Sequence, residues 1–108
     1  MRKQINWARV SEEMYFSGGK PRIKTLSDEQ YNVLCKIAEK SKMDCWFYIK
    51  QHKRGNHAGE DYVFDLENNK AISLRRGVKE LIDGITEQDL EYLTDEEIRT
   101  LEDILIYI

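Results

Sequence analysis

The strongest pattern along the chain is a set of three short runs rich in aromatic and β-branched residues, at positions 45–49, 62–66 and 71–74. Polar and glycine-containing segments separate them, which predicts three strands in an antiparallel meander. In a strand, alternate side chains share a face. This period of two places the following residues together in the first two strands: Cys45, Phe47 and Ile49 in one, and Tyr62, Phe64 and Leu66 in the other.

Helical signals lie on both sides of these runs. Ser27 opens a capping box with Gln30 and precedes an apolar stripe, which predicts a helix that ends near residues 41–43. After the meander, residues 75–84 have an apolar side and end in a glycine, which predicts a short helix. Helices are therefore expected before and after the sheet.

The C-terminal part carries two further helix starts, at Thr86 and Thr94, each followed by acidic residues in the first turn. The final apolar run, Ile104 to Ile108, fits either the end of the last helix or a terminal strand, because a run this short does not separate the two. Residues 1–26 are predicted to be extended, with a hairpin loop at residues 17–21.

These elements predict an α+β fold in one domain that spans residues 1–108. Its antiparallel sheet of three to five strands is expected to pack against one helix from the N-terminal half and two to three C-terminal helices. The chain has 108 residues, of which 41% are hydrophobic and 34% charged, as expected for a globular domain with a well-solvated surface. No apolar run is long enough to span a membrane.

The first residues lack the apolar core of a signal peptide, so a cytoplasmic protein with reduced cysteines is expected. Zinc could be imagined at a set of four residues, but their spacing differs from the close pairs of structural zinc sites: Cys35, Cys45, His52 and His57. No nucleophile signature surrounds either cysteine. The sequence therefore predicts a protein that is not an enzyme and has no metal or cofactor.

A basic segment follows the first predicted strand, with the sequence Lys-Gln-His-Lys-Arg-Gly-Asn-His-Ala-Gly at residues 50–59. Cations beside flat aromatic rings are typical of surfaces that bind single-stranded nucleic acid, because they meet phosphates and bases respectively. The alternative is a solvated hairpin tip. The candidate residues for binding nucleic acid or an acidic partner are Trp46, Tyr48, Lys50, Lys53 and Arg54.

Charge is distributed unevenly along the chain. Residues 1–54 contain 12 basic and 6 acidic residues, whereas residues 55–108 contain 5 basic and 14 acidic residues. Four acids lie three or four residues from Arg99, which predicts an outward helical face that one guanidinium cannot neutralise. With Glu91 added, the candidate acidic face is Glu91, Asp95, Glu96, Glu102 and Asp103. Such a face would dock on a basic protein groove; the alternative is solvated helix surface.

In overall character the chain resembles small inhibitors encoded by phages or mobile elements, in particular the anti-CRISPR proteins directed at Cas9-type effectors. The resemblance rests on a single small domain without an enzymatic motif, an acid-rich segment at residues 87–103 and a basic segment at residues 50–54. It implies a stoichiometric inhibitor, without a cofactor, that blocks guide RNA or DNA engagement by its protein partner. A small RNA- or DNA-binding module and an antitoxin-like regulator are the alternatives, and the sequence leaves monomer and dimer open.

Overall fold

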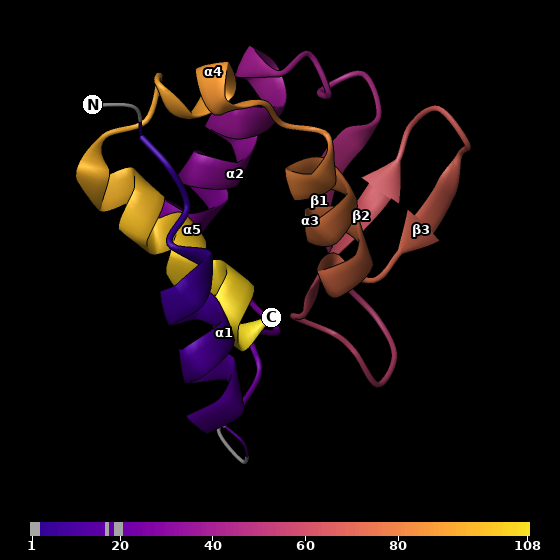
Figure 1. Ribbon diagram of the computed structural model, residues 1–108. Coiled ribbons are helices and arrows are strands. Elements are labelled where there is room, and N and C mark those ends of the chain that lie inside the picture. The colour runs from indigo at the N-terminus through magenta and orange to yellow at the C-terminus, as the bar shows by residue number, and fades with distance from the viewer. Residues whose placement is uncertain (1–2, 17, 19–20) are drawn as a thin grey trace.

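The computed structural model describes residues 3–16, 18 and 21–108. Within this part of the chain, five helices and one three-stranded sheet form the α+β fold that the sequence predicts (Figure 1). In chain order the elements are α1 (Trp7–Phe16), α2 (Asp28–Lys40), β1 (Phe47–Gln51), β2 (Asp61–Asp65), β3 (Lys70–Ile72), α3 (Leu74–Asp83), α4 (Glu87–Leu90) and α5 (Asp95–Tyr107).

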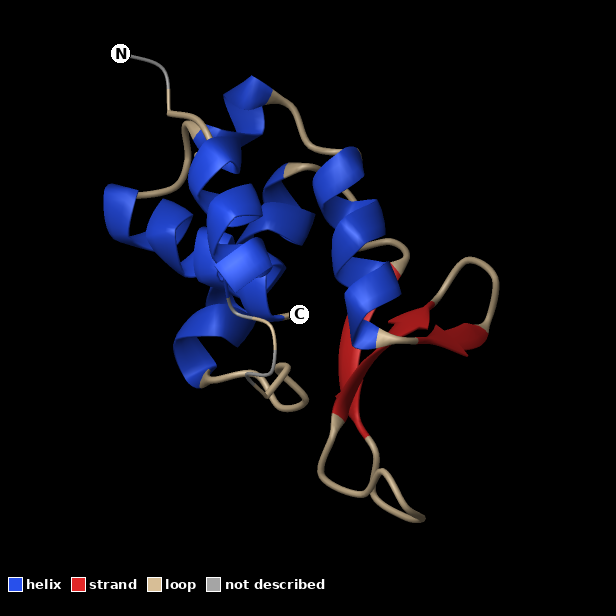
Figure 2. Ribbon diagram, turned by 60° about the horizontal axis from the view of Figure 1, so that its bottom comes forward, coloured by secondary structure: helices blue, strands red, loops and turns tan. Residues whose placement is uncertain are grey.

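The sheet is the predicted antiparallel meander, with strand order β1-β2-β3. Its inner face is apolar because alternate residues of each strand are buried there: Phe47, Ile49, Val63 and Ile72. Helix α3 covers this face (Figures 1 and 2). On the same face Asp65 is buried, and its carboxylate accepts hydrogen bonds from the backbone N–H groups of Glu67 and Asn68. These bonds fix the turn into β3.

Gly77 lets α3 approach the sheet closely. A Cβ atom at this position would lie 2.3 Å from Cγ2 of Val63, which is closer than two carbon atoms can pack. Both residues are buried, and Val63 is held in the central strand by its neighbours on both sides. A glycine at residue 77 is therefore required by packing, although glycine lowers helix propensity.

Gly77→Ala is expected to lower the free energy of unfolding by about 1–2 kcal/mol, because the packing conflict outweighs a helix-propensity gain of up to about 1 kcal/mol. Urea denaturation followed by circular dichroism measures the change. Gly84→Ala is the matched control, since the one close approach of its Cβ is to the flexible end of Met43, the Glu80 carbonyl oxygen lies at an ordinary 3.6 Å, and the residue has a helical φ of −91°. Equal stability of the two variants would contradict this account of the helix–sheet contact.

The remaining helices form a second layer in which α1 and α2 both pack against α5. Capping boxes at Ser27, Thr86 and Thr94 confirm the predicted starts of α2, α4 and α5. Helix α5 continues to Tyr107, so the terminal apolar run is helical rather than a strand. No helix in the described ranges has the length and apolar content needed to cross a bilayer.

The prediction of extended structure near the N-terminus is wrong, because residues 7–16 form α1. Asn6 caps this helix, with its side-chain oxygen accepting a hydrogen bond from the Arg9 N–H. Val10 is its one buried residue, so α1 contributes less to the core than α2, α3 or α5. The predicted hairpin loop at residues 17–21 lies mostly outside the described residues.

Candidate nucleic-acid interface

The sheet face opposite α3 carries three aromatic rings and a lysine. The helices gather on the α3 side of the sheet (Figure 2). The strand register places Tyr48 beside Phe64 and Lys50 beside Tyr62. Because alternate residues share a face, these four side chains point away from the core. We call Tyr48, Lys50, Tyr62 and Phe64 the open sheet face.

Lys50 contacts two of the aromatic rings on this face. Its Nζ atom lies 4.7 Å from the centroid of the Phe64 ring and 5.9 Å from that of Tyr48, within the range of cation–π attraction. Tyr48 remains 49% exposed, so much of its ring is available to a ligand. The open sheet face therefore presents a positive charge among aromatic rings, and no carboxylate belongs to it.

The loop that joins β1 to β2 carries further positive charge beside the open sheet face. The His52 N–H donates to the Glu60 carbonyl at 2.9 Å, and the Gly59 N–H donates to the His52 carbonyl at 2.7 Å. Gly59 has a φ of +87°, a backbone conformation that other residues rarely adopt. These features shape the loop and leave Lys53 and Arg54 exposed. We call residues 52–60 the basic loop.

The open sheet face and the basic loop meet at a hollow of about 650 Å³. At its edge the His52 ring stacks on Tyr62, with 4.2 Å between ring centroids and 27° between ring planes. The side chains that give the hollow its character are Tyr48, Lys50, His52, Lys53, Arg54 and Tyr62. The hollow combines cations with flat rings, which is the chemistry required to bind phosphates and unpaired bases.

A second hollow of about 510 Å³ shares His52 and Tyr62 with the first. It adds three exposed cations: Arg22, Lys24 and Arg75. Its two acids already have partners. A hydrogen bond from the His57 ring at 2.8 Å, supported by Lys24, holds the pKa of Glu60 below its usual value. The Asp61 carboxylate accepts the Leu26 N–H at 2.7 Å.

The structure brings together four of the five residues predicted for the basic site: Tyr48, Lys50, Lys53 and Arg54. The fifth, Trp46, is half-buried and packs against the core, with its ring edge-on to Phe47 at 5.5 Å. Sequence reasoning did not assign Tyr62 and Phe64 to this site. The alternation with Val63 was a signal for them, but only the strand register places their rings beside Tyr48 and Lys50.

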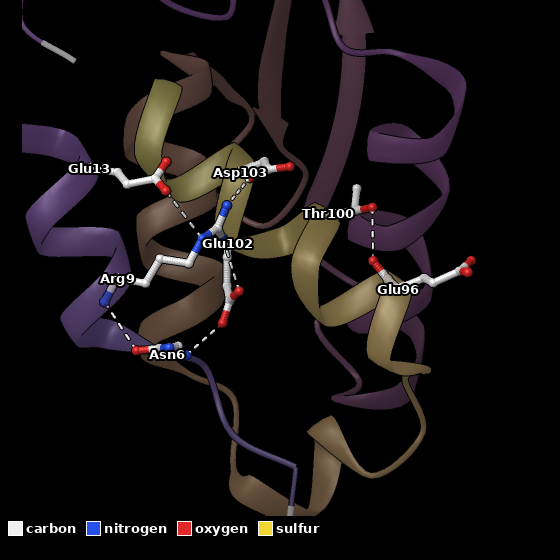
Figure 3. Close-up of polar contacts among 7 residues, drawn as sticks. All are labelled: Asn6, Arg9, Glu13, Glu96, Thr100, Glu102 and Asp103. Atoms are coloured by element: carbon white, nitrogen blue, oxygen red, sulfur yellow. Dashed lines mark hydrogen bonds and ion pairs between the residues drawn. The ribbon is translucent and has the colours of Figure 1, made fainter. Parts of the chain in front are cut away.

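Two of the five acids predicted for the outward acidic face are paired with α1 instead (Figure 3). Glu102 is 6% exposed; its carboxylate lies 3.0 Å from Arg9 Nη1 and accepts the Asn6 N–H at 2.6 Å. Asp103 lies 2.8 Å from Arg9 Nη2, and its hydrogen bond holds the pKa of Arg9 above the usual value. The prediction that these two acids are unneutralised is wrong, because α1 packs on this side of α5 and Arg9 pairs with both. Glu102 is also buried rather than outward, whereas the Asp103 side chain stays 43% exposed.

The other three acids of the predicted face are exposed: Glu91, Asp95 and Glu96. Figure 3 shows the Glu96 side chain pointing away from the Arg9 cluster. In the part of the chain that the structure describes, none of the three forms an ion pair, whereas Glu97 lies 2.9 Å from Lys36 Nζ. The hydrogen bond from Lys36 lowers the pKa of Glu97. A smaller acidic surface than predicted thus remains.

The residues considered for zinc do not form a common site. Cys45 is exposed, and its thiol lies 3.2 Å from a carboxylate oxygen of Glu67, which raises the pKa of the thiol. Cys35 is half-buried on α2, and burial raises its pKa. Across residues 3–16, 18 and 21–108, no group of three histidine, cysteine or acidic side chains is arranged to hold a metal ion.

No protein-family model, curated protein or solved structure matches this chain.

Proposed function

We propose that this chain binds single-stranded nucleic acid across the open sheet face and the basic loop. The observation that carries the proposal is the strand register, which sets Tyr48, Tyr62 and Phe64 around Lys50 on one uncovered face. Lys53 and Arg54 follow directly from the same strand. Bases would stack on the rings while the phosphates meet the cations.

The arrangement favours unpaired strands over duplexes. A base can stack on an aromatic side chain only when its own flat surface is free, and base pairs in a duplex are already stacked on one another. Each base that stacks on an aromatic side chain contributes about 1–3 kcal/mol. On the open sheet face Tyr48 offers an exposed ring for such a base, while Tyr62 already stacks on His52 and Phe64 lies beside Lys50. The face therefore suits a short segment of one to a few nucleotides.

The charge distribution supports this location for the bound nucleic acid. Although the chain has a net charge of −3, the two adjoining hollows gather six cations: Arg22, Lys24, Lys50, Lys53, Arg54 and Arg75. The unpaired acids Glu91, Asp95 and Glu96 lie on and before α5. A polyanion is therefore attracted to the sheet and repelled from the surface near the start of α5.

Fluorescence anisotropy with labelled 12-nucleotide strands tests the proposal. Single-stranded DNA or RNA is expected to bind at 50 mM salt and to bind more tightly than a duplex of the same sequence. The slope of log K against log salt is expected to be about −2 to −3, as for three or four phosphate contacts. Absence of binding at 50 mM salt, or equal affinity for the duplex, would refute the proposal.

The exposed acids favour a second candidate function, an inhibitor that docks on the basic groove of a nucleic-acid-handling protein such as a Cas9-type effector. Glu91, Asp95 and Glu96 are its candidate contacts, since Glu102 and Asp103 are held by Arg9. The anisotropy experiment separates the two functions. An inhibitor of this kind would leave the free strands unbound and would release guide RNA from the effector.

A further inference from the structure

The outer face of α1 exposes more aromatic surface than any other described helix. Trp7 is 53% exposed, Tyr15 82% and Phe16 73%. The opposite side of the helix is fixed to α5 through Val10 and through the Arg9 ion pairs. The exposed rings therefore stand on a helix that is anchored from behind (Figure 1).

Two of the three exposed rings, Trp7 and Tyr15, lie on one helical ridge. Trp7, Ser11 and Tyr15 are spaced four residues apart, so they lie in a row along the helix surface. Ser11 is small and lies at the centre, Ala8 flanks it, and both are exposed. The row thus has a bulky ring at each end and a low centre, which allows another helix to approach closely there.

We infer that this face binds the same face of a second copy of the chain, with the two α1 helices antiparallel about a two-fold axis at Ser11. In such a pair, two residues face each other across the axis when their numbers sum to 22. Trp7 of each copy therefore packs on Tyr15 of the other. The pattern is self-complementary, as a two-fold interface requires.

The area available agrees with a weak dimer. An aromatic side chain offers roughly 150–250 Å² of surface. At the exposed fractions of Trp7 and Tyr15, the two rings of the row supply roughly 200–350 Å² per copy. Two copies with Ala8 and Ser11 stay below roughly 1,000 Å², in the range of weak, transient contacts. A dimer that forms only at high protein concentration, roughly 100 µM or above, is expected.

The inference does not depend on the proposed function. The rings of α1 belong to a different part of the molecule from the open sheet face, as Figures 1 and 2 show. The two contacts also respond differently to salt. An apolar dimer persists as salt rises, whereas nucleic-acid binding weakens.

Sedimentation velocity between roughly 1 and 500 µM tests the dimer. The wild-type chain is expected to shift from monomer to dimer in this range, and Tyr15→Glu is expected to remain monomeric. Tyr92→Glu is the matched control, since Tyr92 is 51% exposed on another segment. A wild-type monomer throughout the range would overturn the inference, as would equal behaviour of the two variants.

A disulfide at the axis tests the geometry separately. In a chain with Cys35→Ala and Cys45→Ser, Ser11→Cys is expected to form a cross-linked dimer on mild oxidation, because residue 11 faces its own copy within disulfide range. Asn32→Cys, at an exposed position of α2, is the control. Cross-linking at residue 11 no faster than at residue 32 would overturn the proposed arrangement.

Discussion

Lys53→Glu combined with Arg54→Glu is expected to weaken binding of a single-stranded 12-mer by about 10–100-fold at 100 mM salt. The two side chains supply two of the proposed phosphate contacts, and their reversal adds repulsion to the loss of attraction. The salt slope should become shallower by about 1.4, because each phosphate that a cation neutralises contributes about 0.7 to the slope for a single strand. Both side chains are exposed, so the fold should be retained. Anisotropy titrations over a series of salt concentrations measure both quantities.

The matched control is Lys79→Glu combined with Arg99→Glu, which changes the net charge equally at exposed positions of α3 and α5. It is expected to change affinity by less than about threefold, because charges beyond a Debye length are largely screened. If both double variants weakened binding equally, attraction by the overall charge of the protein, and not the proposed site, would explain the binding. Tyr48→Ala and Tyr48→Phe then separate stacking from hydroxyl contacts, since only the former removes the ring.

Arg9→Ala is expected to lower the free energy of unfolding by about 3 kcal/mol. The substitution leaves the Glu102 carboxylate buried with only the Asn6 N–H as a partner, and an uncompensated buried charge is strongly destabilising. It also removes the contact between α1 and Asp103. Urea denaturation at pH 7, followed by circular dichroism, measures the change.

Glu13→Ala provides the comparison, since it removes an exposed partner of Arg9 at 3.5 Å and should cost only about 0.3–0.5 kcal/mol. Arg9→Met with Glu102→Leu should recover much of the stability, because an apolar pair replaces a buried ion pair without leaving a charge alone. A decrease of less than about 1 kcal/mol in Arg9→Ala would show that Glu102 reaches water in the folded state.

The helices that sequence reasoning found are those whose signals are local. Ser27, Thr86 and Thr94 each cap a helix within three residues, so the chain near each of them is sufficient to place its start. Helix α1 has a cap at Asn6 but no capping box and one buried residue, Val10. Its position is determined by contacts with α5, more than 90 residues away in sequence.

The same distance explains the errors at the candidate sites. Whether Glu102 faces solvent depends on α1 and on Arg9, which the local charge pattern around Arg99 does not reveal. For the sheet, the period of two separated the faces correctly within the strands, but Cys45 and Leu66, which it also placed on these faces, lie in turns outside them. Which face of the sheet is covered depends on where α3 packs. Gly77 indicates the contact between α3 and the sheet only when the structure shows that Val63 lies against it.

The pairing of α1 with α5 has a consequence for synthesis of the protein. The meander and α3 are continuous in sequence, so they can form while the rest of the chain is still being translated. The ion pair between Arg9 and Glu102 can form only after Glu102 has been synthesised, 93 residues later than Arg9. Until then the nascent chain carries α1 without the helix that it packs against.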